Sequence, residues 1–320
     1  MRYYCTHFNI RYLNRAIALH ESMEQNAGDY HLFMFAFDDV SVRALEKLAL
    51  PHVTVVPYGE FENEELLELK ARRSFKEYMW TVTAFIIGHV FEHFNVTACT
   101  YIDADIFFFG DPEPVFHERE DFSAIITEHR YHPKYDQTAT SGRFCVQFNT
   151  FTRSPGSQQI LRAWQRSVAE WCYDRQEEGK FGDQMYLDEW PGKYPGVHIA
   201  THPGIGVAPW NVLNCRDLSE QDGRVSFLTP SGERSEVIFY HFHGVSLFSA
   251  RVAELGNFIL KKPVTGQLYR PYLEAIRRAN RRIVEVAPEA ALFTPFDWSW
   301  RNLARQVIRI KRGIFHISKY

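Results

Sequence analysis

Apolar positions in the first third of the chain follow two spacings. Residues 2–8 and 31–37 are apolar runs of strand length, and between them the apolar residues from Leu13 to Met23 recur at helical spacing. This order predicts a β-α-β opening. The same patterns predict further strands at 53–56, 99–103, 123–127, 144–151 and 237–241, and helices at 62–72, 78–94 and 157–173. Strands alternating with helices predict an α/β fold, with a mostly parallel sheet covered by helices on both faces.

The pattern changes to basic helices near residue 259. These helices are predicted at 268–284 and 300–317, with the proline-containing segment 287–295 between them. We place a boundary near residue 255, so that a main domain covers 1–255 and a helical basic extension covers 256–320. A chain of 320 residues with 45% apolar content has enough apolar side chains for one large core and an appendage.

The formal charge of −3 hides an asymmetry. From Phe258 to the end there are thirteen Lys and Arg and four Asp and Glu, so this part carries +9 and the rest −12. A basic segment on an acidic body indicates an anionic surface as partner rather than nucleic acid. Residues 298–320 begin with Trp298 and Trp300 and then mix basic with apolar residues, as in helices that lie on an anionic membrane surface. The alternative is a helix packed against the main domain with solvated arginines.

Cysteine usage and the first residues predict a cytoplasmic protein. The five cysteines form no CxxC pair, so neither a disulfide framework nor a thiolate zinc site is indicated. The first residues read as a strand, without the apolar core of a signal peptide, and no window has the roughly 18 apolar residues that span a bilayer. Together with the basic tail, this predicts a cytoplasmic location with peripheral association at the inner face of a membrane.

Two carboxylates follow the predicted strand at 99–103. Asp103 and Asp105 are one residue apart, so in an extended chain they lie on one face. Ligands bind at strand ends in open α/β sheets. Two carboxylates there can bind a hard divalent cation, which in turn contacts phosphate oxygens. An isolated Asp-x-Asp is as easily a polar strand end, so the surrounding sequence has to decide.

The segment Tyr101-Ile102-Asp103-Ala104-Asp105, after a long predicted helix, resembles the DxD motif of the GT-A glycosyltransferases. The closest group is family eight, which contains glycogenin and the lipopolysaccharide galactosyltransferases. Segments that resemble further motifs of this group follow in the required order at 147–150 (Gln-Phe-Asn-Thr), 182–184 (Gly-Asp-Gln), 208–211 (Ala-Pro-Trp-Asn) and 240–244 (Tyr-His-Phe-His-Gly). The resemblance covers most of residues 1–250. It implies a GT-A fold, a nucleotide-sugar donor with UDP as the expected nucleotide, Mn²⁺ or Mg²⁺, and a glycan or lipid-linked acceptor.

The resemblance also implies roles for single residues. Asp103, Asp105 and His241 are expected to hold the metal ion, because His241 stands three residues before Gly244 as in the group. His243 lies on the same side of an extended strand and is a second candidate for metal or phosphate contact. The remaining predicted residues are Asn149 near the donor sugar, Asp183 and Gln184 facing donor sugar and acceptor, Ala104 beside the metal, and Trp210 as a surface on which a sugar stacks.

The sequence departs from the group in three places. The glycine that ends the group's Phe-Asn motif is replaced by Phe151. The Lys-Pro-Trp expected after the histidine is replaced by residues 245–248, Val-Ser-Leu-Phe, so a different cation is needed for the diphosphate. Arg73 and Lys76 are candidates, because a helix N-terminus and adjacent basic side chains form an anion site; a solvated turn is the alternative. Thr6 and Asn9 follow the first strand, where the group binds the nucleotide base, but their residue types leave the base open.

The predicted reaction is sugar transfer in surface polysaccharide biosynthesis, with retention of anomeric configuration by resemblance. Inversion would need a carboxylate base, for which Asp183 or Glu128 is available. One alternative is a phosphatase of the HAD group, which also uses Asp-x-Asp at a strand end. That group has the motif near the N-terminus and Thr or Val where Phe107 stands. The other alternative is a catalytically silent sugar-binding protein with the same architecture.

Overall fold

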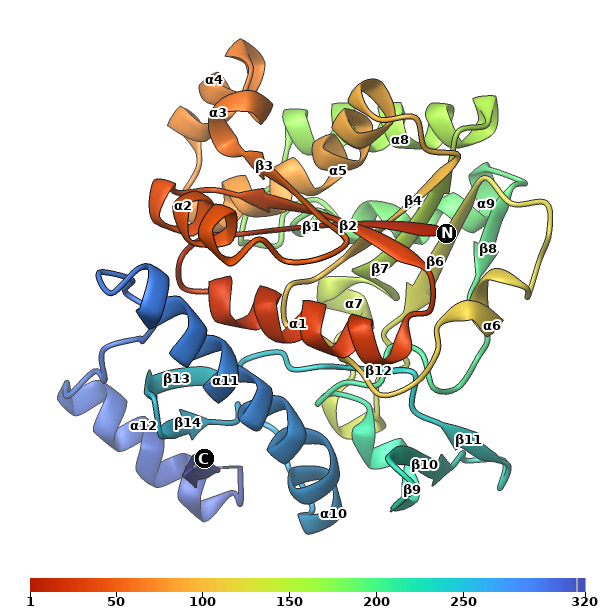
Figure 1. The fold of residues 1–320 in the computed structure, drawn as a ribbon. Helices are drawn as coiled ribbons and strands as arrows, with labels where there is room; N and C mark the ends of the chain where they lie inside the picture. Colours follow the sequence, from red (N-terminus) through yellow and green to blue (C-terminus); the bar gives the residue numbers. More distant parts are fainter. Residues whose placement is uncertain (315, 320) are drawn as a thin grey trace.

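A computed structural model describes residues 1–314 and 316–319. Seven strands form the central sheet in the order β3-β2-β1-β4-β7-β6-β8 (Figure 1). Their bounds are β1 (Arg2–Phe8), β2 (Tyr30–Ala36), β3 (Val53–Pro57), β4 (Ala98–Ile102), β6 (Ala124–Glu128), β7 (Phe144–Thr152) and β8 (Val197–Ile199). Neighbouring strands are parallel except where β7 lies antiparallel to β4 and β6. The predicted α/β fold with a mostly parallel sheet is therefore confirmed.

Helices cover both faces of this sheet (Figure 1). One face packs on α1 (Leu13–Asn26), α2 (Asp39–Leu48) and α11 (Arg270–Val286), and the other on α4 (Glu64–Arg72), α5 (Phe75–His93) and α8 (Pro155–Glu170). The helix α5 begins at a capping box, in which the Ser74 hydroxyl accepts from the Glu77 N–H and the Glu77 carboxylate accepts from the Ser74 N–H. This cap fixes the start of the helix that leads into β4 and the two carboxylates.

The described residues also form three smaller sheets. They are β5 (Ile106–Phe108) with β12 (Phe239–His241), β9 (Arg216–Gln221) with β10 (Arg224–Leu228) and β11 (Arg234–Glu236), and β13 (Ser246–Ser249) with β14 (Val252–Glu254) and β15 (Ile317–Lys319). The short helices are α3 (Tyr58–Phe61), α6 (Glu113–Phe116), α7 (Thr138–Ser141), α9 (Trp190–Lys193) and α10 (Lys262–Val264). Tighter turns cover Pro133–Tyr135, Met185–Glu189 and Val212–Asn214, and a wider one covers Thr265–Tyr269. The antiparallel pairing of β5 with β12 brings His241 opposite Ile106, beside Asp105.

The C-terminal region corrects one predicted element. The helix expected over 300–317 is α12 (Trp300–Lys311), and Gly313, with a φ of +65°, turns the chain into β15, which pairs with β14. The helix α11 packs on α1, and Asn14 Nδ2 donates to Asn280 Oδ1 at 2.8 Å in the interior. The domain boundary near residue 255 stays a prediction. Within residues 1–314 and 316–319, no helix has the length and apolar character that crossing a bilayer requires.

Candidate active site

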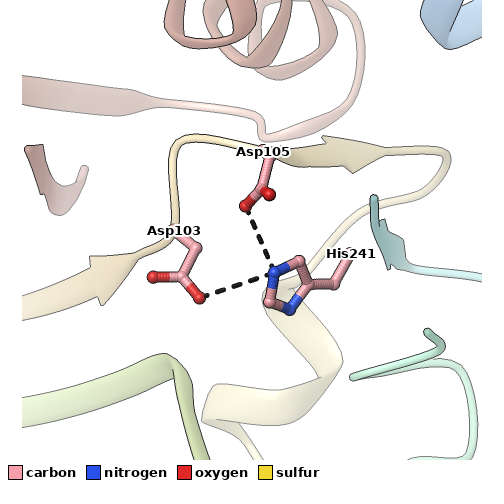
Figure 2. Close-up of side chains that lie close together, drawn as sticks. All are labelled: Asp103, Asp105 and His241. Atoms are coloured by element: carbon pink, nitrogen blue, oxygen red, sulfur yellow. Dashed lines mark ion pairs between the residues drawn. The ribbon is translucent and has the colours of Figure 1, made fainter. Parts of the chain in front are cut away.

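Asp103, Asp105 and His241 converge from two chain segments, the loop between β4 and β5 and the end of β12 (Figure 2). Asp103 follows β4, Asp105 precedes β5, and His241 is the last residue of β12. The Nε2 atom of His241 lies 3.2 Å from an oxygen of Asp105 and 3.7 Å from an oxygen of Asp103. One possible ligand atom from each residue lies within 4.8 Å of the others. The structure thus brings together the three residues that the sequence predicts as metal ligands.

The donor set and its surroundings fit a divalent cation. Carboxylate oxygens suit Mg²⁺ and Mn²⁺, and an imidazole nitrogen is accepted by Mn²⁺ and its neighbours in the transition series. The Nδ1 atom of His241 lies 2.8 Å from Oε1 of Gln147, so a proton on Nδ1 leaves Nε2 free for a metal ion. The Tyr101 hydroxyl donates to Asp103 at 2.7 Å. The role of Gln147 was missed from sequence, although it stands two residues before Asn149, on the same side of β7.

Burial and mutual charge set the pKa values of these groups. Burial raises the pKa of Asp103 above its ordinary value, although the charge of His241 opposes this. Burial acts in the same direction on Asp105, but the charge and hydrogen bond of His241 prevail and lower its pKa to about 2. For His241, burial acts to lower the pKa, and the two carboxylates overcome it and raise the pKa well above the ordinary range. The imidazole therefore carries a proton that a divalent cation would displace.

The three residues line a cavity of about 680 Å³. The ends of β1 and β4 contribute His7, Phe8, Tyr101 and Asp103 to its wall. Seven other predicted site residues also line it: Asn9, Lys76, Ala104, Asp183, Gln184, Trp210 and His243. The cavity therefore joins the predicted metal site to most of the predicted donor and acceptor contacts.

Three predicted site residues lie outside the cavity wall. Thr6 is buried within β1. Arg73 contacts the hydroxyl of Thr81, and its Nη2 donates to the carbonyl of Ala169 at 2.7 Å, so the guanidinium ties the start of α5 to the end of α8. Asn149 is buried in β7, and among the described residues neither atom of its amide group has a hydrogen-bond partner. The roles expected of these three residues stay predictions.

Asp183 and Gln184 follow a tight turn on the cavity wall. Gly182 has a φ of +55°, and a Cβ there would stand 3.3 Å from the ring of Trp80, so both the turn and its packing favour glycine. Trp164 Nε1 donates to the carbonyl of Asp183 at 2.9 Å and holds its backbone. Burial, and then the charge of Asp103, raise the pKa of Asp183 to about 7. Its carboxyl group can therefore act as donor or acceptor near neutral pH.

Trp210 lies against both histidines of the site. Its ring is edge-on to His241 at 5.3 Å and to His243 at 5.5 Å between centroids, and its Nε1 donates to the carbonyl of His129 at 3.0 Å. Burial, opposed by hydrogen bonds to its ring, lowers the pKa of His129 to about 3, so this ring is neutral. Phe258 also lines the cavity, and no motif in the sequence singled it out.

Comparison with known proteins gives two relatives from Bacillus subtilis (strain 168). The uncharacterized protein YfnD is 30% identical over 279 residues, which cover 84% of this chain and 87% of YfnD. The uncharacterized protein YfnF is 33% identical over 254 residues, which cover 77% of this chain and 82% of YfnF. The chain belongs to the YfnD and YfnF family. No protein-family model matches the chain.

Solved glycosyltransferases share the fold of this YfnD-family chain. The galactosyltransferase LgtC, crystallised with donor and acceptor sugar analogues, aligns with a TM-score of 0.50 and 11% identity over 94% of this chain and 99% of LgtC. The glycosyltransferase GlyE of Streptococcus pneumoniae TIGR4 aligns with a TM-score of 0.52 and 10% identity over 96% of this chain and 72% of GlyE. The predicted GT-A fold of the YfnD-family chain is therefore confirmed. Sequence identities of 10% and 11% establish a shared fold and nothing further.

Proposed function

We propose that the protein is a metal-dependent glycosyltransferase that moves a sugar from a nucleoside-diphosphate donor to a hydroxyl group of an acceptor. The observation that carries the proposal is the convergence of Asp103, Asp105 and His241 on the wall of a cavity of about 680 Å³. The GT-A fold of the chain supports it, since the solved structures that share the fold are glycosyltransferases. The HAD phosphatase alternative loses its support for the same reason.

The residues at the site have separable roles in this proposal. Asp103, Asp105 and His241 would hold a divalent cation, which when bound neutralises charge on the departing nucleoside diphosphate. Gln147 keeps Nε2 of His241 available by engaging Nδ1. Asp183 would bind a donor hydroxyl or orient the acceptor hydroxyl from the cavity wall. Gln184 lines the cavity beside it, and its Nε2 donates to the carbonyl of Ser141 at 2.7 Å, which fixes its orientation.

The finer features of the proposal rest on the family-eight resemblance. We propose UDP as the nucleotide of the donor, Mn²⁺ or Mg²⁺ as the ion, and retention of anomeric configuration. The acceptor would be a glycan or a lipid-linked glycan in surface polysaccharide biosynthesis. LgtC was crystallised with donor and acceptor sugar analogues, which supports sugar partners of both kinds. Product configuration, read by nuclear magnetic resonance of the anomeric proton, tests retention against the inverting use of Asp183.

We propose a cytoplasmic protein that associates with an anionic membrane surface through residues 298–320, of which 315 and 320 lie outside the described residues. Trp298 and Trp300 are 76% and 87% exposed, and α12 exposes Val307, Ile308 and Ile310. Replacing these three α12 residues with serine should reduce co-sedimentation with phosphatidylglycerol vesicles. Neutral phosphatidylcholine vesicles serve as control. Equal binding of wild type and variant would reject the association.

The decisive experiment measures binding and hydrolysis of nucleotide sugars with and without Mn²⁺. A panel of UDP, GDP, ADP, CDP and dTDP sugars is offered to the full chain, and release of the nucleoside diphosphate is followed. We expect metal-dependent turnover of one donor class. Metal-dependent binding without turnover, in the presence of candidate acceptors, would favour the silent sugar-binding protein. If no donor is bound and none is turned over, both the glycosyltransferase and the silent sugar-binding protein are rejected.

A further inference from the structure

The proposed donor brings negative charge into a cavity with few protein cations. Asp103 and Asp105 would balance one divalent ion, so the two charges of a donor diphosphate call for another positive group. Residues 245–248, Val-Ser-Leu-Phe, stand where the resembling group has Lys-Pro-Trp, so the lysine of that group is absent here. Among the described residues, Arg11 and Lys76 are the arginine and lysine that line the cavity.

Lys76 is already engaged by the protein. Its Nζ pairs with Asp174 at 2.7 Å and lies 4.5 Å from the ring centroid of Trp80. The backbone N–H of Asp174 donates to the Glu77 carboxylate at 2.9 Å. The adjacent residues Lys76 and Glu77 of α5 therefore both contact Asp174. Binding a diphosphate through Lys76 would require this ion pair to break. The charge of Lys76 is therefore already balanced by Asp174, in the segment that follows α8.

Arg11 has the opposite arrangement. Its backbone N–H donates to the Asn9 side chain at 3.1 Å, and its carbonyl accepts from Nη1 of Arg15 at 2.6 Å. Arg15 is 5% exposed and also donates to the carbonyl of Val245 at 2.8 Å. The backbone of Arg11 is thus held on both sides, while its side chain is exposed at the cavity. Across residues 1–314 and 316–319, no carboxylate forms an ion pair with its guanidinium.

We propose that Arg11 is the protein cation that binds the diphosphate of the donor, in place of the lysine of the Lys-Pro-Trp segment that residues 245–248 replace. The inference rests on the proposed function of the cavity. A guanidinium stays charged at all relevant pH values and offers parallel N–H groups to two phosphate oxygens at once. Since Arg11 has no carboxylate to release among the described residues, phosphate binding there breaks no ion pair of the free protein.

Calorimetry on the full chain tests this assignment. Wild type, Arg11→Ala, Arg11→Lys and Lys76→Ala are titrated at saturating Mn²⁺ with UDP, GDP, ADP, CDP, dTDP and inorganic pyrophosphate. For the nucleotide that wild type binds best, Arg11→Ala should raise Kd roughly 10- to 100-fold, as expected for lost hydrogen bonds to a charged group. The Kd of Arg11→Lys should lie between those of wild type and Arg11→Ala. The corresponding nucleoside, which has no phosphate, should bind wild type and Arg11→Ala with equal affinity. Thermal unfolding should be unchanged, because Arg11 is exposed.

The outcomes that overturn the inference can be told apart from a failure of the proposed function. Nucleotide binding by Arg11→Ala at the wild-type Kd would remove its role, and a larger loss in Lys76→Ala would transfer the role to Lys76. Equal losses of nucleoside and nucleotide affinity in Arg11→Ala would assign Arg11 to the nucleoside. If wild type binds pyrophosphate but no nucleotide, the proposed function fails while the comparison of variants with pyrophosphate still tests the anion site. If wild type binds neither pyrophosphate nor any nucleotide, both the role of Arg11 and the proposed function are overturned.

Discussion

Two groups of largely buried charged residues, among those that the structure describes, differ in how their charge is balanced. At the first, Asp103 and Asp105 face His241 on a cavity wall, so negative charge exceeds positive charge there. At the second, Arg309 of α12 pairs with Glu254 of β14, with side chains 7% and 11% exposed, and neither lines the cavity. Arg309 also donates to the carbonyl of Gly256 at 2.8 Å.

The contrast separates a binding site from a structural contact. The charges of Glu254 and Arg309 cancel within the protein, and the pair joins the C-terminal helix to the strand that also receives β15. The charges of the first group are left for a ligand to balance. Both groups are polar and buried, so burial alone would not have distinguished them. Four variants test the contrast through stability and binding.

Arg309→Met should have the largest effect, on stability. It leaves the carboxylate of Glu254 buried without its partner, and breaking a buried pair in this way costs about 3–5 kcal/mol. Urea unfolding followed by circular dichroism measures the loss. The double variant Arg309→Met with Glu254→Leu should recover most of it, because apolar side chains of similar volume replace the whole pair. A single variant as stable as wild type would mean that the pair is not structural.

Asp103→Asn should have the next largest effect, on binding. Removal of one ligand should weaken Mn²⁺-dependent nucleotide binding roughly 100-fold or more, since loss of outer-shell partners alone costs 10- to 100-fold. The metal-free protein should not lose stability at neutral pH. Burial raises the pKa of Asp103, and a carboxyl group with a raised folded-state pKa destabilises the fold once the pH exceeds its unfolded pKa. Calorimetry of the variant measures nucleotide binding, and urea unfolding measures the free energy of unfolding. A marked loss of that free energy would show that Asp103, like Arg309, has a structural role.

Local sequence pattern was enough for much of the sheet, and the family-eight resemblance was enough for the three candidate metal-binding residues that lie together in the structure. The strand predicted at 144–151 is β7 (Phe144–Thr152), and the helix predicted at 78–94 is α5 (Phe75–His93). These elements are set by apolar periodicity and by caps within a few residues. His241 was found because a motif fixes its distance from Gly244.

Contacts between distant segments were not predictable in this way. Gln147 meets His241 across 94 residues, and the antiparallel direction of β7 follows from its pairing with β4 and β6. Arg73 was expected at the donor site because it is basic and precedes a helix, but it turns toward Ala169 and its charge is used inside the fold. The sequence shows which residues are charged, and the tertiary structure decides which charges are already balanced.

Gln147→Ala should have a smaller effect on the same site. Without Oε1, the imidazole of His241 loses the acceptor for Nδ1–H, which orients the ring and fixes its tautomer. The affinity for Mn²⁺ should fall about 10- to 100-fold, as for other outer-shell partners of metal ligands. Gln147→Glu keeps an acceptor oxygen and should retain most of the affinity. Equal affinity of the alanine variant and wild type would show that the cavity alone orients His241.

His316→Leu should have the smallest effect. His316 follows α12, the helix that carries Arg309 of the Arg309–Glu254 pair. The Nε2 atom of His316 lies 3.1 Å from the carbonyl oxygen of Phe258, so the tail also contacts a segment that lines the cavity. Loss of one such hydrogen bond should reduce the free energy of unfolding by about 0.5–1.5 kcal/mol. Amide exchange over residues 256–260 should accelerate more than exchange over β1 and β4, since the contact is local. Mn²⁺-dependent nucleotide binding should stay unchanged, because the candidate metal-binding residues Asp103, Asp105 and His241 lie on other elements. His316→Gln, which can still donate to the Phe258 carbonyl, is the matched control. A loss of nucleotide affinity in His316→Leu with normal exchange would instead connect the C-terminal region directly to the site.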